Sequence, residues 1–283
     1  MRKQQTKNRG LTLIELLVTI AIMGIVIAIA VPVLRPPVDA RAVKEAARMV
    51  STSLASARTR ALATGQSWGV QFEPLDAAGR QAGTLHFVQV VPPYTGSGTV
   101  SSGSFSGLGS YVNNGGLLKL NYQGNEYRYP DDGSEGTLSA DPPPDGTYDF
   151  QFYPVPRKSA AMPVQLPDRA VIDIGLSGWG DVGSLFTPSA SVPVKITFKA
   201  TGEIDQIYHG VVAAGEDVTE RVHFFIGKTG RTDTTSSDPE DNHLLDGEAI
   251  WVSVDPRTGA IRSVENASNN GGDVATARTW AIQ

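Results

Sequence analysis

The sequence predicts an α+β fold in which a long N-terminal α-helix, with a transmembrane half and an amphipathic half, packs on an antiparallel β-sheet globular domain. Three observations predict this class. Residues 11–31 contain a single ionisable group, Glu15. Apolar side chains then recur every three or four residues as far as residue 61, as on one face of a helix. From residue 67 onward they alternate with polar or small residues, as in half-buried strands.

The composition excludes several classes of protein. The 283 residues contain no Cys, which excludes disulfide scaffolds, thiolate zinc sites, cysteine nucleophiles and lipid-modified cysteine anchors. The charge is uneven along the chain. The first ten residues carry four basic and no acidic side chains, whereas residues 11–283 carry 20 Lys and Arg against 29 Asp and Glu, a net charge of −9. We therefore interpret residues 1–10 as a basic leader peptide.

A membrane-spanning helix is predicted at residues 11–31. Its length as a helix, about 31 Å, matches the ~30 Å hydrocarbon thickness of a bilayer. The basic residues before it predict a cytoplasmic N-terminus, with residues 32–283 on the outer side of the membrane. Two other interpretations stay open, a secretory signal peptide cleaved before Val31 and a plain single-pass anchor. The apolar run is longer than the roughly 7–15 residues of a signal peptide, and neither alternative explains Glu15.

The start of this run carries a specific motif. The basic leader is followed by Gly10-Leu11-Thr12-Leu13-Ile14-Glu15, which resembles the processing signal of type IV pilins and type II secretion pseudopilins. The resemblance implies that a prepilin peptidase cleaves between Gly10 and Leu11 and methylates the new N-terminus. Leu11 departs from the usual Phe. Pro32 falls where that family commonly has a proline in its long helix, and we expect a helix break there.

Glu15 is the residue to which this resemblance gives a role. A carboxylate on a membrane helix costs roughly 3 kcal/mol, so such an acid is expected to have a partner. After cleavage, the new α-amino group of Leu11 lies in the same apolar zone, and Glu15 of one subunit can neutralise that amine on its neighbour. The pseudopilin at the filament tip typically lacks this acid, so its presence predicts a position other than the tip.

Residues 32–66 are predicted to continue the helix as its amphipathic half. The apolar stripe consists of Val43, Ala47, Val50, Leu54, Ala57 and Ala61. We expect this face to lie on the sheet. Asp39 is the candidate N-cap and Gly65 the candidate end of the helix.

A β-rich domain is predicted at residues 67–283. A hairpin is expected from Trp68–Phe72 and Leu85–Val91. The other expected strands lie at 117–122, 148–153, 170–174, 194–199, 204–212, 220–226, 250–254 and 261–264. Three Thr-Gly pairs, ending at Gly202, Gly230 and Gly259, predict turns in which the glycine has a positive φ. Residues 92–168, rich in Gly, Pro and Ser, are interpreted as extended loops or an insertion.

Three softer similarities concern the subgroup. The junction at 55–72, the segment Ile196–Gly202 and the segment His223–Arg231 are similar to the helix-to-strand junction and to two strands of H-type (GspH/FimT-like) minor pseudopilins. The chain departs from that group in its greater length.

Candidate metal ligands and catalytic motifs are few. Calcium is bound by several oxygen ligands from acidic loops, and the calcium candidates are Asp233, Asp238, Glu240 and Asp241; solvated acidic turns are the alternative. The sequence has no G-x-S-x-G or H-E-x-x-H motif, and its four His are dispersed. No cofactor and no enzymatic activity are expected.

The predicted function is therefore structural: a minor pseudopilin in the inner-membrane pseudopilus of a type II secretion system. The resemblance implies a prepilin peptidase, other pilin-like subunits and secretion platform proteins as partners. It also implies a single-pass bacterial inner-membrane protein with a periplasmic C-terminal domain. The alternatives are a minor type IV pilin and an exported β-rich protein. Nucleic acid is not expected to bind, because the charge of −9 opposes it; a local patch of Arg257, Arg262 and Arg278 is the one feature that would favour it.

Overall fold

The N-terminal part of the chain forms two helices, α1 (Leu13–Val33) and α2 (Pro37–Thr64). They belong to a computed structural model that describes residues 13–33, 37–101, 104–106, 117–129, 144–180, 184–210, 215–231, 236, 238, 241–267 and 273–282. The chain divides into two compact units, Met1–Arg41 and Ala42–Gln283. Each unit is described by itself.

The predicted fold class, with one long N-terminal helix packed on the sheet, is wrong. The chain is mostly antiparallel β-sheet. Its N-terminal part has two separate helices of 21 and 28 residues, and the boundary between the compact units lies at Arg41 and Ala42. The predicted break at Pro32 is also misplaced, because α1 continues through Pro32 to Val33. The new helix begins at Pro37, where a missing N–H is tolerated, so Asp39 lies inside its first turn rather than at the N-cap.

Within the described residues, no helix has the length and apolar character that crossing a membrane requires. The structure therefore does not support the transmembrane span predicted at residues 11–31.

The larger sheet has the strand order β13-β12-β1-β2-β10-β14-β15-β16 among the described residues, with β8 and β9 also paired to β2 and β11 to β10; every pairing is antiparallel. Its strands are β1 (Trp68–Pro74), β2 (Gln81–Gln89), β8 (Arg157–Lys158), β9 (Val164–Gln165), β10 (Ala170–Trp179), β11 (Ser184–Leu185), β12 (Lys195–Phe198), β13 (Ile204–Tyr208), β14 (Val222–Lys228), β15 (Ile250–Val254) and β16 (Ile261–Glu265). The expected hairpin of β1 and β2 is confirmed, with Val70 opposite Phe87.

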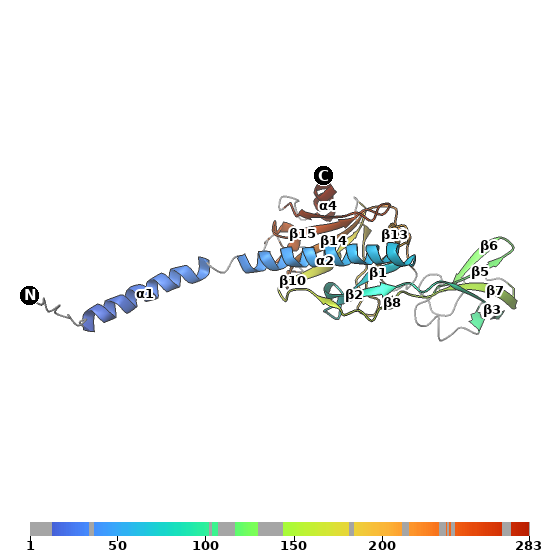
Figure 1. Cartoon of the computed structure of the whole chain (residues 1–283), viewed down its shortest axis with the longest axis horizontal. Coiled ribbons are helices and arrows are strands. Elements are labelled where there is room, and N and C mark those ends of the chain that lie inside the picture. Colours follow the sequence, from blue (N-terminus) through green and yellow to red (C-terminus); the bar gives the residue numbers. More distant parts are fainter. Residues whose placement is uncertain are drawn as a thin grey trace, which may run out of the picture. The chain divides into compact units, whose positions relative to one another are not determined.

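The main core lies between α2 and one face of this sheet. The whole predicted stripe of α2, from Val43 to Ala61, is buried in the same cluster as Val70, Phe72 and Ile196 of the sheet. Figure 1 shows α2 running across the strands. The helix ends at Thr64, and the φ of 68° at the next residue, Gly65, confirms the predicted stop.

Two of the predicted Thr-Gly turns meet at α2. Gly202 and Gly259 have φ values of 89° and 63°, as expected. Arg58 of α2 donates from Nε to the carbonyl oxygen of Gly202 at 3.1 Å. A Cβ on Gly259 would overlap that same oxygen and lie 2.7 Å from Arg58 Nε. The two turns are therefore in close contact with each other and with the helix.

A second sheet is inserted between β2 and β8. Its order is β4-β3-β7-β5-β6, again antiparallel. Its strands are β3 (Tyr94–Ser101), β4 (Ser104–Ser106), β5 (Leu117–Tyr122), β6 (Asn125–Tyr129) and β7 (Gly146–Tyr153). The sheet has a small core of its own, in which Leu118, Leu120, Phe150 and Phe152 are buried. A short 3-10 helix, η1 (His243–Leu245), and the C-terminal helix α4 (Val274–Ile282) complete the described elements.

Candidate functional site

The predicted processing and assembly residues lie at the N-terminal end of the chain. Gly10 and Leu11 fall outside the described residues. Glu15 is the third residue of α1, where the unpaired N–H groups of a helix favour negative charge. The helix therefore starts within one turn of the predicted cleavage point.

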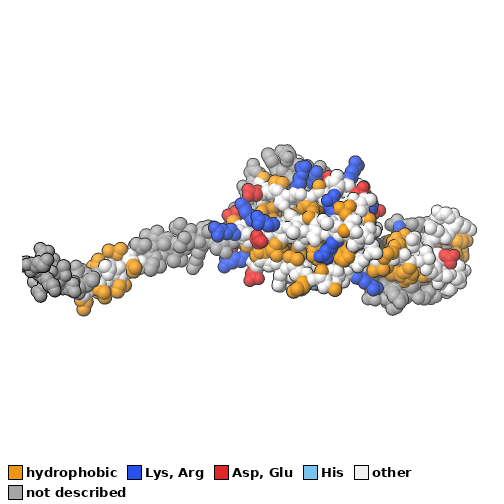
Figure 2. Space-filling view, in the orientation of Figure 1, with side chains coloured by type: hydrophobic (Ala, Val, Ile, Leu, Met, Phe, Trp, Pro, Cys, Tyr) orange, Lys and Arg blue, Asp and Glu red, His pale blue; other side chains and the backbone are white. Residues whose placement is uncertain are grey.

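The described part of α1 presents apolar side chains on every side. The exposed ones are Leu13, Ile14, Leu16, Leu17, Val18, Ile20, Ile22 and Met23. Figure 2 shows this surface in orange. The hydroxyl of Thr19 donates to the carbonyl oxygen of Leu16 at 2.8 Å, so it is satisfied within the helix. A helix that is apolar all round is expected to be covered by lipid or by other helices.

The four calcium candidates are not brought together in the described part of the chain. Asp233 and Glu240 lie outside it, and Asp238 and Asp241 are exposed. The N–H of Asp241 donates to the carbonyl oxygen of Asp238 at 3.1 Å, which closes a turn. Among the described residues there is no group of three His, Asp or Glu that could hold a metal ion.

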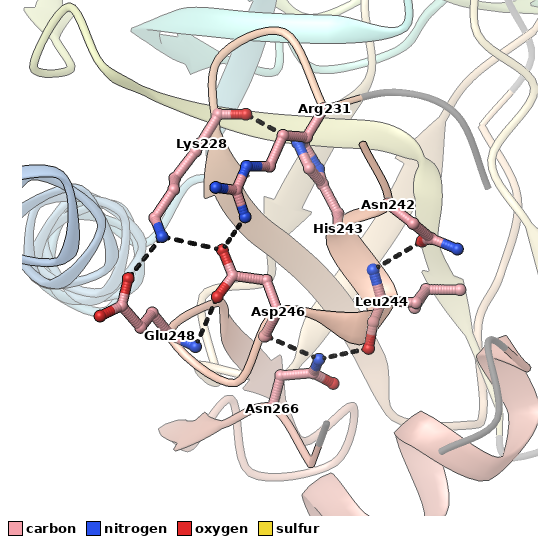
Figure 3. Close-up of polar contacts among 8 residues, drawn as sticks. All are labelled: Lys228, Arg231, Asn242, His243, Leu244, Asp246, Glu248 and Asn266. Carbon is pink, nitrogen blue, oxygen red and sulfur yellow. Dashed lines mark hydrogen bonds and ion pairs between the residues drawn. The ribbon is translucent and has the colours of Figure 1, made fainter. Parts of the chain in front are cut away.

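Next to this turn, a polar network fixes the connection from β14 to β15. Asp246 accepts from Nη1 of Arg231 at 2.8 Å and pairs with Nζ of Lys228 at 3.1 Å (Figure 3). Lys228 also pairs with Glu248. Burial alone would lower the pKa of Lys228, but its hydrogen bonds to Glu248 and Asp246 raise it. The ammonium group is therefore held by two carboxylates, Asp246 and Glu248.

Asn266, the residue that follows β16, supports the same connection. Its Nδ2 donates to the carbonyl oxygens of Leu244 and Asp246 at 2.8 and 3.0 Å, and its Oδ1 accepts from the indole of Trp251 at 3.1 Å. Asn242 caps η1 through a bond from the N–H of Leu244. Every polar atom of the Asn266 amide is thus used, as a buried amide requires.

A buried charge cluster lies beneath η1. Nε2 of His243 is 2.7 Å from the carbonyl oxygen of Lys228 and must donate to it, because a carbonyl has no proton. Nδ1 then faces Oδ2 of Asp173 at 3.4 Å, with both side chains at most 1% exposed. Neither of these two atoms has a hydrogen-bond partner within the described residues. Arg80 Nε lies 3.5 Å from the other carboxylate oxygen.

His223 and Ser253 form a contact, within the described residues, that has the spacing of a nucleophile and its base. The hydroxyl oxygen of Ser253 lies 2.8 Å from Nδ1 of His223. The two side chains are 3% and 0% exposed, so neither is open to a substrate in this conformation. Burial, followed by the charges of Arg278 and Arg221, lowers the pKa of His223 to about 3. The ring is a poor base at neutral pH, and the pair joins β14 to β15 instead.

The structure removes Arg278 from the basic surface patch that the sequence suggested. Its side chain is fully buried. The guanidinium donates to the carbonyl oxygens of Leu176, Trp179 and Ser184 at 3.0, 3.2 and 3.2 Å, which fastens α4 to β10 and β11. Burial lowers its pKa to about 10. Sequence reasoning missed this role, and no local pattern around residue 278 indicates it.

Comparison with known proteins locates the functional signal in the N-terminal segment. Residues 5–31 match the family model described as the prokaryotic N-terminal methylation motif. No curated protein and no solved structure matches the chain. The chain therefore carries the methylation motif of type IV pilin-like proteins, as the residues around Gly10 and Glu15 predicted, and the match does not support the H-type subgroup.

Proposed function

We propose that this chain is a non-enzymatic minor pseudopilin, built into the pseudopilus of a type II secretion system after cleavage behind Gly10 and N-methylation of Leu11. The match of residues 5–31 to the methylation motif carries this proposal. The expected partners are a prepilin peptidase, other pilin-like subunits and the secretion platform proteins. Similarity of 55–72, 196–202 and 223–231 to H-type pseudopilins favours that subgroup within the proposal.

The apolar surface of α1 supports assembly through the N-terminal segment. Its exposed side chains have no partner among the described residues of their own unit, and a second copy or another subunit can cover them. Glu15 lies in the first turn, where it can meet the methylated amine of a neighbouring subunit. We further propose that this segment attaches the chain to the bacterial inner membrane, with the C-terminal domain in the periplasm.

A test of assembly compares Glu15→Gln with the wild type. The neutral amide is isosteric but cannot pair with an amine in a low-dielectric zone, so the variant is expected to reach the membrane fraction and to be lost from filaments. Thr19→Ala is the matched control, because the hydroxyl of Thr19 donates to the carbonyl oxygen of Leu16 in its own helix. Incorporation of Glu15→Gln at the wild-type level contradicts the role assigned to Glu15.

The second candidate is a minor type IV pilin, favoured by the same motif because both kinds of subunit carry it. A deletion strain separates the two. Loss of exoprotein secretion with intact surface pili supports the pseudopilin, and loss of pili with intact secretion supports the pilin. An exported β-rich protein is the outcome if the mature chain starts at Val31.

A further inference from the structure

The second sheet has a buried face and an exposed face. Its buried face carries the small core described above. Successive residues of a strand point to opposite faces, so the residues that alternate with the core side chains form the exposed face. The exposed polar residues of this face include Thr95 on β3, Asn121 on β5, and Asp149 and Gln151 on β7.

The main sheet closes without this insertion. The strands on either side of it, β2 and β8, pair directly with each other, with Val88 opposite Lys158. The second sheet is therefore free to serve a purpose of its own.

The register of the strands brings the polar residues together around a hollow. Gln151 lies opposite Thr95 on one side and opposite Lys119 on the other, and β3, β7 and β5 are neighbours in the sheet (Figure 1). Asp149 lies two residues before Gln151, and Asn121 two residues after Lys119. Together these side chains line a hollow of about 600 Å³, a volume typical of small-molecule sites.

Several polar groups of the hollow can exchange water for a ligand. Within the described residues, the side chains of Thr95, Asn121 and Asp149 make no hydrogen bond or ion pair. Oε1 of Gln151 accepts from the hydroxyl of Tyr153 at 2.8 Å, which leaves its Nε2 to donate elsewhere. The hollow thus presents a carboxylate, two amides and a hydroxyl side by side.

Tyr153 gives the hollow an apolar wall. Its ring is half-buried, its hydroxyl is held by Gln151, and Nζ of Lys119 lies 5.3 Å from the centre of the ring. Tyrosine combines an apolar body with a polar tip, which suits a surface that is partly wet. Because the ring is already held in place, a ligand that packs on it loses little free energy in ordering it.

The charges of the hollow favour a neutral ligand. Its lining contains one cation, Lys119, and one anion, Asp149, so it has no net charge. A saccharide matches this lining. Each of its hydroxyl groups both donates and accepts, so it can pair with a carboxylate, an amide or a hydroxyl, and the C–H groups of its ring can pack against Tyr153.

We propose that the exposed face of the second sheet binds a neutral saccharide, with Asp149, Asn121 and Gln151 bonded to its hydroxyl groups and Tyr153 against its ring. The proposal uses no residue of the N-terminal segment. It is therefore independent of the assembly role proposed above.

The test is isothermal titration calorimetry of the full-length chain in micelles of lauryldimethylamine oxide, a detergent whose head group is not a sugar and cannot compete. The probes are cellotetraose, maltotetraose and tetra-N-acetylchitotetraose. At least one of them is expected to bind with a Kd of about 1 mM or lower. Binding of a glucose oligomer identifies a glucan as the ligand, and binding of the N-acetylglucosamine oligomer alone identifies an amino-sugar polymer.

Two variants assign the binding to the hollow. Asp149→Ala and Asn121→Ala each remove an exposed side chain, so both are expected to fold with the wild-type melting temperature. Each should weaken the binding, Asp149→Ala by about tenfold or more, because a hydrogen bond to a charged group is lost. Thr147→Ala is the matched control, because Thr147 is exposed on the same strand but does not line the hollow.

The proposal is overturned if none of the three saccharides binds, or if Thr147→Ala weakens the binding as much as Asp149→Ala does. A neutral peptide, acetyl-tetraserine amide, tests whether hydroxyl groups on any backbone are enough. Equal binding of this peptide also contradicts a saccharide site. If Asp149→Ala has a lowered melting temperature, the comparison of Asn121→Ala with Thr147→Ala decides.

Discussion

Replacement of Gly259 by Ala tests the contact between two turns and α2. Gly259 has a φ of 63° and lies against the Gly202 carbonyl oxygen, which accepts from Arg58. An added Cβ would overlap that oxygen and would also lie 2.7 Å from Arg58 Nε. The turn or the helix must shift, so the contact cannot survive unchanged.

The expected loss in the free energy of unfolding has two parts. Holding a non-glycine residue at positive φ costs about 1–2 kcal/mol. Displacing the carbonyl and breaking its bond to Arg58 adds about 1–3 kcal/mol. We therefore expect Gly259→Ala to lose about 3 kcal/mol. Gly230→Ala is the matched control, because Gly230 has a φ of 89° with nothing within 4 Å of its Cβ position, and only the strain of about 1–2 kcal/mol applies.

The assay is equilibrium unfolding in urea, followed by tryptophan fluorescence of the full-length variants. The urea concentration at the unfolding midpoint should be lower in both variants than in the wild type, and the decrease should be clearly larger for Gly259→Ala than for Gly230→Ala. Equal losses in the two variants would refute the close contact between the turns and α2.

Three further predictions concern buried groups and processing. His223 has its pKa lowered to about 3 from the ordinary 6.5, so below pH 6.5 protons bind first to the unfolded chain and stability falls. Between pH 7 and pH 5, His223 should account for about 2 kcal/mol of the decrease in the free energy of unfolding. The decrease should be smaller by that amount in His223→Gln, as measured by urea unfolding at both pH values. Arg278→Ala should lower the free energy of unfolding by about 3 kcal/mol or more, because it leaves the carbonyl oxygens of Leu176 and Ser184 without their donor. Hydrogen exchange of the backbone amides in α4 should become faster in this variant. Unchanged exchange argues against the attachment of α4 through Arg278. Replacing Gly10 with Val should block cleavage, so that the chain keeps its leader mass by mass spectrometry; normal processing of this variant contradicts the cleavage point.

The local elements were predictable from sequence. Strands expected at 117–122, 148–153 and 250–254 agree with β5, β7 and β15, because alternation of apolar residues is a property of each segment alone. The turn glycines at 202, 230 and 259 all have positive φ, as expected from their Thr-Gly pairs. The stripe of α2 is buried because its spacing places those side chains on one face.

The arrangement of these elements was less predictable. The division between α1 and α2 is visible in the sequence at Arg35-Pro36-Pro37, because proline removes a helical hydrogen bond and clashes with the preceding turn. The pairing of β2 with β10 joins segments that are far apart in sequence. The strands β3 to β7 build a sheet of their own, which a composition rich in Gly, Pro and Ser does not reveal.

The buried charges were the least predictable part of the candidate sites. No local sequence pattern indicates that Arg278 is buried, because the carbonyl groups that accept its hydrogen bonds come from residues about a hundred positions earlier. Asp173 and His243 meet only through the fold. The methylation motif, by contrast, is a contiguous segment, residues 5–31, and it could therefore be recognised from the sequence alone.

The mass and N-terminal sequence of the mature chain show directly whether it is processed after Gly10. We expect a chain that begins at Leu11 and carries a methyl group on its α-amine. A chain that begins at Val31, or one that keeps the leader from Met1 in a host with an active prepilin peptidase, would contradict it.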